Sequence, residues 1–210
     1  MKIHFIRHAE SEQNARHEFQ ADSIGLSPLG QKQLESLEST LSGLNIKRIY
    51  SSTMPRAEKT AEAVASALKL PIAYSDLLVE VKWPSELDGL PLHDPKSEVV
   101  RAKISEMYHL GNWRYSDEET YDEFRARGQK FIDEKIVAGE GTESWAVISH
   151  GDCIKMIVAL LIFGDTLTPQ FFQKFKRQMK LHHGSISTLE YTKDGNLWIL
   201  TSWNDRSHLT

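Results

Sequence analysis

Near its N-terminus the chain reads Lys2-Ile3-His4-Phe5-Ile6, and Arg7-His8 follows directly. A short run rich in β-branched and aromatic residues is typical of a strand, and the basic residues after it mark the strand's end. The pattern returns in Ala146-Val147-Ile148-Ser149, which leads through His150-Gly151 into a strongly apolar helical run. Buried strands that alternate with helical segments predict an α/β fold.

Helix signals fill the chain between and after these two strands. Ser27-Pro28 supplies a serine cap and a first-turn proline. Thr120 and Glu123 form a capping box for a helix expected to run to about Ala138. Other expected elements are a strand at 48–51, helices that begin near Pro55, Pro95, Asp152 and Pro169, and a hairpin that turns at Asp194-Gly195. The expected fold is a three-layer α/β sandwich, with a central, mostly parallel sheet between helices.

The whole chain, residues 1–210, is expected to form a single domain, since its length suits one hydrophobic core. The periodic pattern weakens in the middle of the sequence, where Pro84, Gly89 and Pro91 mark loops. We expect residues 78–117 to form an insertion, or lid, over the ligand edge of the sheet.

Composition argues against several classes of function. The chain is 40% hydrophobic and 26% charged, and its net charge of −4 disfavours bulk binding to nucleic acid or to an anionic membrane. The apolar run Met156–Phe163 is too short to span a bilayer, and Arg7 comes too early for a signal peptide. With Cys153 as the single cysteine, no intramolecular disulfide is possible, so we expect a cytoplasmic protein.

Three expected strand ends deliver cationic or imidazole groups to one edge of the sheet. They are Arg7-His8 after the first strand, Arg56 after the second and His150 after the third. Ligands of α/β sheets bind beyond the carboxyl ends of the strands, where helix N-termini also favour anions. Two arginines suit phosphate oxygens, so this convergence predicts a phosphate pocket.

The stretch Arg7-His8-Ala9-Glu10-Ser11-Glu12-Gln13-Asn14 resembles the signature of the histidine phosphatase superfamily, which includes the phosphoglycerate mutases. Further stretches similar to that family are Leu26-Ser27-Pro28-Leu29-Gly30, Ser51-Ser52, Arg56-Ala57, Lys59-Thr60-Ala61, Ser149-His150-Gly151 and Gly184-Ser185-Ile186. The resemblance implies that His8 attacks phosphorus and carries a phosphohistidine. It also implies that Arg7, Arg56 and His150 hold the phosphoryl oxygens, with Asn14 and Gly151 as further phosphate-binding residues.

The family also places a proton-donating glutamate in the loop after the second helix. Glu80 matches that position best, and Glu86 lies in the same loop as the alternative. A loosely similar loop makes Asp22 and Ser23 weaker candidates for substrate binding, and His183 is a candidate for the pocket rim. The family chemistry needs no metal and no cofactor, and none is expected here.

These features together predict a phosphomonoesterase that acts on a small soluble phosphate ester. The loop at Lys82-Trp83-Pro84-Ser85 is unlike the glycine-rich loop of the mutases, which favours hydrolysis. A phosphoglycerate mutase-type transfer is the first alternative. A module that only binds phosphorylated ligands is the second. The sequence leaves the physiological substrate and the oligomeric state open.

Overall fold

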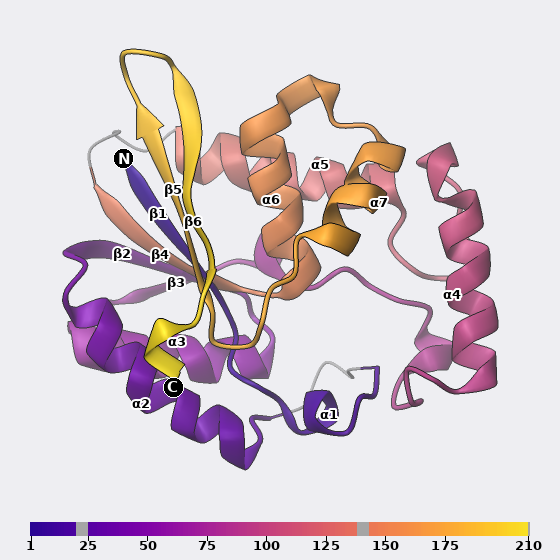
Figure 1. Cartoon of the computed structure of the whole chain (residues 1–210), viewed down its shortest axis with the longest axis horizontal. Coiled ribbons are helices and arrows are strands. Elements are labelled where there is room, and N and C mark those ends of the chain that lie inside the picture. The colour runs from indigo at the N-terminus through magenta and orange to yellow at the C-terminus, as the bar shows by residue number, and fades with distance from the viewer. Residues whose placement is uncertain (20–24, 138–142, 210) are drawn as a thin grey trace.

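The computed structural model describes residues 1–19, 25–137 and 143–209. A six-stranded sheet forms its centre, in the order β3-β2-β4-β1-β5-β6 (Figure 1). The strands are β1 (Lys2–Arg7), β2 (Ile46–Ser51), β3 (Ile72–Tyr74), β4 (Ser144–Ser149), β5 (Ile186–Thr192) and β6 (Leu197–Asp205). Strands β1 to β4 run parallel, whereas β5 is antiparallel to β1, and β6 is antiparallel to β5. The carboxyl ends of four strands therefore meet at one edge.

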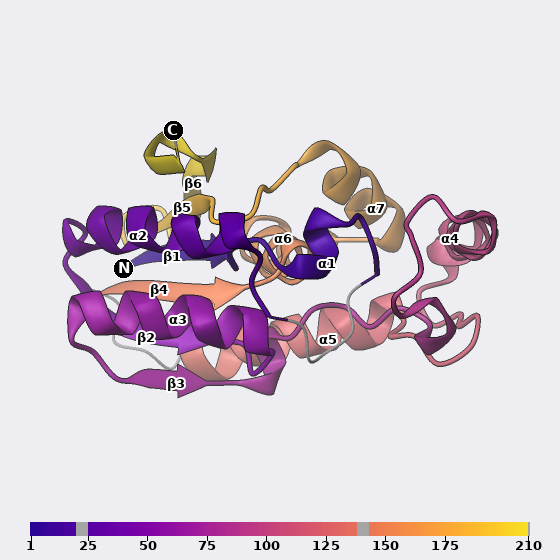
Figure 2. The same cartoon turned by 90° about the horizontal axis from the view of Figure 1, so that it is seen from below.

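Helices cover both faces of the sheet (Figure 2). The helices are α1 (Glu12–Ala15), α2 (Pro28–Ser42), α3 (Pro55–Leu68), α4 (Pro95–Met107), α5 (Tyr121–Phe131), α6 (Gly151–Phe163) and α7 (Pro169–Gln178). Short 3₁₀ turns are η1 (Asp76–Leu78), η2 (Ser85–Leu87), η3 (Tyr108–Leu110), η5 (Gly164–Thr166) and η6 (Ser207–Leu209), and η4 (Ile132–Val137) is π-helical. Figure 1 shows α4 away from the sheet, beyond its carboxyl edge.

Strand β1 contributes to the core on both of its faces, because successive side chains of a strand alternate. Ile3 and Phe5 belong to the apolar cluster formed with α5 and α6. Ile6 points to the other face and belongs to the cluster formed with α2 and α3. A third and smaller cluster, Phe19, Leu87 and Val100, lies beneath α4. Within the described residues, none of the helices has the length and hydropathy that crossing a bilayer requires.

The structure confirms the predicted α/β class and adds two elements that the sequence pattern did not indicate. Strand β3 is three residues long and forms the edge of the sheet, where Tyr74 is exposed. Such a short edge strand carries too little alternation to be recognised. Helix α1 has four residues and begins at Glu12, with Ser11 as its N-cap. The helix after Thr120 is α-helical only as far as Phe131, where the π-helical segment η4 begins.

Candidate active site

The strand ends place the predicted residues next to one another at the carboxyl edge of the sheet. Beyond β1, the N–H of His8 donates to the carbonyl of Ser149 at 2.8 Å. Beyond β2, the N–H of Ser52 donates to the carbonyl of Ile148 at 3.0 Å. His8, Ser52 and His150 therefore leave the sheet side by side, from three segments far apart in the sequence.

His8 is a buried, neutral imidazole with one nitrogen available for reaction. Its side chain is 1% exposed, and its Nδ1 lies 2.7 Å from the backbone carbonyl of Ala9. A carbonyl only accepts hydrogen bonds, so Nδ1 carries the proton and Nε2 keeps its lone pair. Burial, followed by the proximity of His150 and Arg56, lowers the pKa of His8 well below its ordinary value. Near neutral pH the side chain is thus in its nucleophilic form.

His150 lies beside His8, with 5.0 Å between the ring centroids. It is fully buried, and its Nε2 shares a 2.8 Å hydrogen bond with the Ser52 hydroxyl. Its Nδ1 is also buried, and no group in the described part of the chain bonds to it. A buried nitrogen without a hydrogen-bond partner costs free energy, so a ligand atom that bonds to it is stabilised there. A phosphoryl oxygen would satisfy it.

Two arginines bring positive charge to the same place. Arg7 donates through Nη1 to the carbonyl of Leu181 at 2.6 Å, and its buried Nε has no partner among the described residues. Arg56, in the first turn of α3, is 2% exposed. The positive charges of both guanidinium groups help to lower the pKa of His8. Buried guanidinium groups of this kind favour a bound anion.

Gly151 and Asn14 border this centre in different ways. Gly151 is the first residue of α6, so the helix cannot pair its backbone N–H. A Cβ at this position would lie 3.4 Å from Arg7 Cζ, so the glycine leaves room for the guanidinium group. Asn14 Oδ1 accepts from the N–H and the hydroxyl of Ser11, at 3.3 Å and 2.8 Å. Only the amide nitrogen of Asn14 is left to donate to a ligand.

Glu80 lies at the N-terminus of α6, next to His150. Its carboxylate accepts from the backbone N–H groups of Asp152 at 3.2 Å and Cys153 at 3.1 Å. The N–H of Val81 donates to the same carboxylate at 3.0 Å. Glu80 and Arg56 both line a cavity of about 600 Å³. The glutamate thus stands at the border between the phosphate-binding centre and the space open to a substrate.

The alternative glutamate occupies a different position. Glu86 belongs to η2 and pairs at 2.8 Å with Lys96, where both side chains are substantially exposed. It is not among the residues that line the cavity beside Arg56. The geometry therefore favours Glu80 over Glu86 as the group nearest the reacting centre. Asp22 and Ser23 lie outside the described residues.

An arginine on α5 holds the segment that carries Glu80, and the sequence motifs did not indicate it. Arg127 Nη1 donates to the carbonyls of Leu77 at 3.0 Å and Val79 at 2.8 Å. Its Nε and Nη2 bond to the two carboxylate oxygens of Glu119, each at 2.7 Å. Arg127 lies between Phe124 and Phe131, which are both buried. A charged residue among buried positions of one helix was the available signal.

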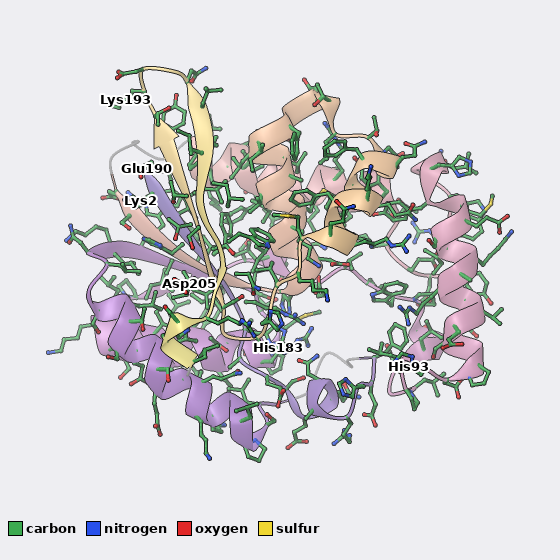
Figure 3. All side chains as sticks on the ribbon, in the orientation of Figure 1. Lys2, His93, His183, Glu190, Lys193 and Asp205 are labelled. Atoms are coloured by element: carbon green, nitrogen blue, oxygen red, sulfur yellow. The ribbon has the colours of Figure 1, made fainter. Side chains whose placement is uncertain are left out.

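His183 is a third imidazole close to His8, with 5.4 Å between the ring centroids. Burial, followed by the proximity of Arg7, lowers the pKa of His183 to about 2, so the ring is neutral. Its Nε2 is buried, with no partner in the described residues. Figure 3 shows His183 on the loop before β5, close to the carboxyl edge of the sheet. Within the described residues, no group of three or more His, Cys, Asp or Glu side chains has a metal-binding arrangement.

Two of the quoted sequence motifs hold the loop after His8 in place. The Thr60 hydroxyl accepts from the N–H of Ala9 at 3.1 Å and donates to the carbonyl of Arg56 at 2.8 Å. Gly30 packs directly on the backbone of Glu10, where an added Cβ would lie 2.1 Å from the carbonyl oxygen. These contacts fix the chain that follows His8.

Comparison with known proteins identifies the family of the chain. The family model "Histidine phosphatase superfamily (branch 1)" matches residues 3–206. "Probable phosphatase C1687.21" of Schizosaccharomyces pombe is 30% identical, over 100% of this chain and 95% of that protein. "Broad-specificity phosphatase YOR283W" of Saccharomyces cerevisiae is 23% identical, over 100% of this chain and 87% of that protein.

A solved structure has the same fold. A mycobacterial glucosyl-3-phosphoglycerate phosphatase, crystallised with VO3, superposes with a TM-score of 0.80. The two sequences are 20% identical, and the match covers 98% of this chain and 99% of that one. The match to the family model spans almost the entire sequence, including every strand end described above. The chain belongs to branch 1 of the histidine phosphatase superfamily.

Proposed function

We propose that this phosphoric monoester hydrolase works through a phosphohistidine formed on His8. The observation that carries the proposal is the state of the His8 ring. Its Nδ1 is committed to the carbonyl of Ala9, and its Nε2 is left unprotonated beside Arg7, Arg56 and His150. An imidazole held neutral among cationic groups is poised to attack an anionic phosphate.

In the first step, Arg7, Arg56 and His150 Nδ1 receive the phosphoryl oxygens of the ester. His8 Nε2 attacks phosphorus, so an N–P bond forms while the bond from phosphorus to the ester oxygen breaks. Glu80 enters this step with its carboxyl group protonated, and the departing alkoxide takes that proton, which is general acid catalysis. The alcohol then leaves through the cavity beside Glu80.

In the second step, a water molecule takes the place of the alcohol. The Glu80 carboxylate accepts a proton from the water, and the water oxygen attacks the phosphohistidine. The N–P bond breaks, its electron pair returns to His8 Nε2, and inorganic phosphate is released. Glu80 is protonated again, ready for the next ester. The steps use groups of this chain alone, so we expect activity to survive a chelator.

The substrate class in this proposal is a small soluble phosphate ester. A mutase would return the phosphoryl group to a second alcohol oxygen, and a binding module would leave it in place. Incubation with an aryl phosphate and with 2- and 3-phosphoglycerate distinguishes the three functions. Hydrolysis predicts free phosphate from the aryl ester and near-total loss in His8→Ala. The phosphoglycerate isomer without free phosphate would indicate a mutase, and phosphopeptide binding without turnover would indicate a binding module.

A further inference from the structure

The cavity beside Glu80 is much larger than a phosphoryl group needs. Its volume of about 600 Å³ lies within the range of pockets that hold whole metabolites or drug-sized ligands. Arg56 and Glu80 line the part nearest the proposed chemistry. The remaining lining must therefore contact the alcohol part of the ester, and its side chains define what that alcohol can be.

Arg101, on α4, lines the same cavity as Arg56 and Glu80. It donates through Nη1 to the carbonyl of Leu92 at 3.1 Å. Among the described residues, no carboxylate forms an ion pair with it, whereas Lys82 in the same cavity pairs with Asp117 at 2.8 Å. Arg101 consequently keeps several guanidinium N–H donors for a ligand.

Apolar side chains line the same cavity as Arg101 and Arg56. Phe19 and Trp83 meet edge to face, with 5.5 Å between their ring centroids. Phe19 is buried in the small cluster beneath α4, and Trp83 packs against that cluster. Both rings line the cavity, together with Leu92 and Val81. A flat or apolar body fits these walls better than a short polyol does.

A second cavity, of about 610 Å³, shares Trp83 and Arg101 with the first. Its lining adds Arg177 and Lys176, and Lys176 Nζ lies 5.0 Å from the centre of the Tyr108 ring. Figure 3 labels His93, which lines this second cavity, near α4 and apart from His183. The lining also contains Asp152 and Glu98, and Lys176 pairs with Asp152 at 3.4 Å. Among the described residues, Arg101 and Arg177 are the arginines of this lining that form no ion pair with a carboxylate.

We infer that Arg101 is a specificity-determining residue that binds a second anionic group of the substrate. The preferred substrate is then a phosphate monoester whose alcohol has a flat or apolar body ending in a carboxylate or phosphate. The inference rests on the proposed function, because the scissile phosphate must first lie at His8. A guanidinium group binds either kind of anion through paired N–H donors.

Three aryl phosphates with similar leaving groups test this inference. They are 4-ethylphenyl phosphate, 4-(carboxymethyl)phenyl phosphate and 4-(phosphonomethyl)phenyl phosphate, and kcat and KM are measured for each. For the wild-type enzyme we expect at least one anionic probe to have a KM about tenfold below that of the ethyl probe. The better of the two anionic probes identifies carboxylate or phosphate as the preferred group.

Arg101→Met should abolish this discrimination by raising the KM of the anionic probe, and Arg101→Lys should restore part of it. Arg48→Met is the matched control, because it also removes one exposed positive charge. Arg48 lies on β2, where it pairs with Glu143, and it does not line the cavity. Equal KM values for all three probes in the wild type would overturn the inference. So would an unchanged preference in Arg101→Met. Failure of the proposed function gives a different result from failure of this inference. In that case the His8→Ala enzyme would still hydrolyse the ethyl probe.

Discussion

The rings of His8 and His150 lie 5.0 Å apart at their centroids, and both are buried where two parallel strands end. Burial lowers the pKa of each ring well below its ordinary value, and the nearby arginines add to the effect. In the mechanism that we propose, these two neutral imidazoles and the two guanidinium groups beside them receive an anionic phosphate, and His8 attacks it. Both the centre and the parts of the fold that support it can be tested by substitution and titration.

The first prediction concerns the protonation of His8. A histidine with an ordinary pKa near 6.5 is mostly protonated at about pH 5. Because the folded-state pKa of His8 is lowered, its ring should stay neutral there, with the proton on Nδ1. Nitrogen NMR of the labelled protein across about pH 5 to 8 reads this state directly. A ring that titrates near 6.5 would contradict the assigned nucleophilic form.

The second prediction concerns Arg127, which positions the segment that carries Glu80. Arg127→Met should lower kcat for alkyl phosphates more than for aryl phosphates, because poor leaving groups depend most on proton donation. Glu80→Gln should show the same dependence on the leaving group, with a loss of about a hundredfold or more for alkyl esters. Arg127→Lys should recover part of the loss.

Arg125→Met is the control for this series, since Arg125 also lies on α5 but pairs with the exposed Asp165 at 3.3 Å. It should leave both classes of substrate unaffected. If Arg127→Met slows aryl and alkyl esters equally while Glu80→Gln does not, Arg127 has only a structural role. If Glu80→Gln shows no dependence on the leaving group, Glu80 is not the proton donor.

The third prediction concerns the support of the loop after His8. Gly30→Ala places a Cβ 2.1 Å from the carbonyl oxygen of Glu10, so the backbone of α2 or of this loop must move. We expect a loss of about 2 kcal/mol in the free energy of unfolding, together with reduced kcat. Gly25→Ala is the control, because no atom of the described residues lies within 4 Å of its added Cβ. Urea unfolding compares the two variants, and equal stability would refute the proposed contact.

The fourth prediction concerns acid stability and His4 on β1. His4 bonds to Thr188 at 3.0 Å and to Ser144 at 3.1 Å, and burial lowers its pKa from 6.5 to about 4. Between these two pH values the unfolded state binds more protons, so stability falls as the pH drops from 6.5 to about 4. The shift corresponds to about 3 kcal/mol, which is fully present above pH 6.5.

Urea unfolding of His4→Gln should show a shallower dependence on pH in this window than the wild type. Part of the pH dependence of stability should remain in both proteins. It comes from the buried rings of His8, His150 and His183, because burial lowers the pKa of each of them as well. A variant whose stability depends on pH as steeply as that of the wild type would exclude His4 as a source of the effect.

The strand ends explain why so much of the centre was predictable. Arg7 ends an apolar strand, His8 and His150 come directly after such strands, and parallel strands bring their carboxyl ends to one edge. Strand β3 was not predicted, because its three residues at the edge of the sheet show no clear alternation of apolar and polar side chains. The positions of Arg127 and Arg101 depend on how α5 and α4 pack against distant loops. For Arg101 that packing leaves no local pattern in the sequence, and for Arg127 it leaves only a charged residue among the buried positions of a helix.

The phosphohistidine itself provides the most direct test of the central claim. The enzyme is mixed with a radiolabelled phosphate ester, denatured in alkali within one turnover, and digested for mass spectrometry. We predict label on the peptide that contains His8, stable in alkali, lost in acid, and absent from His8→Ala. An active enzyme that carries no label on His8, or that carries an acid-stable label on a different residue, would contradict the account.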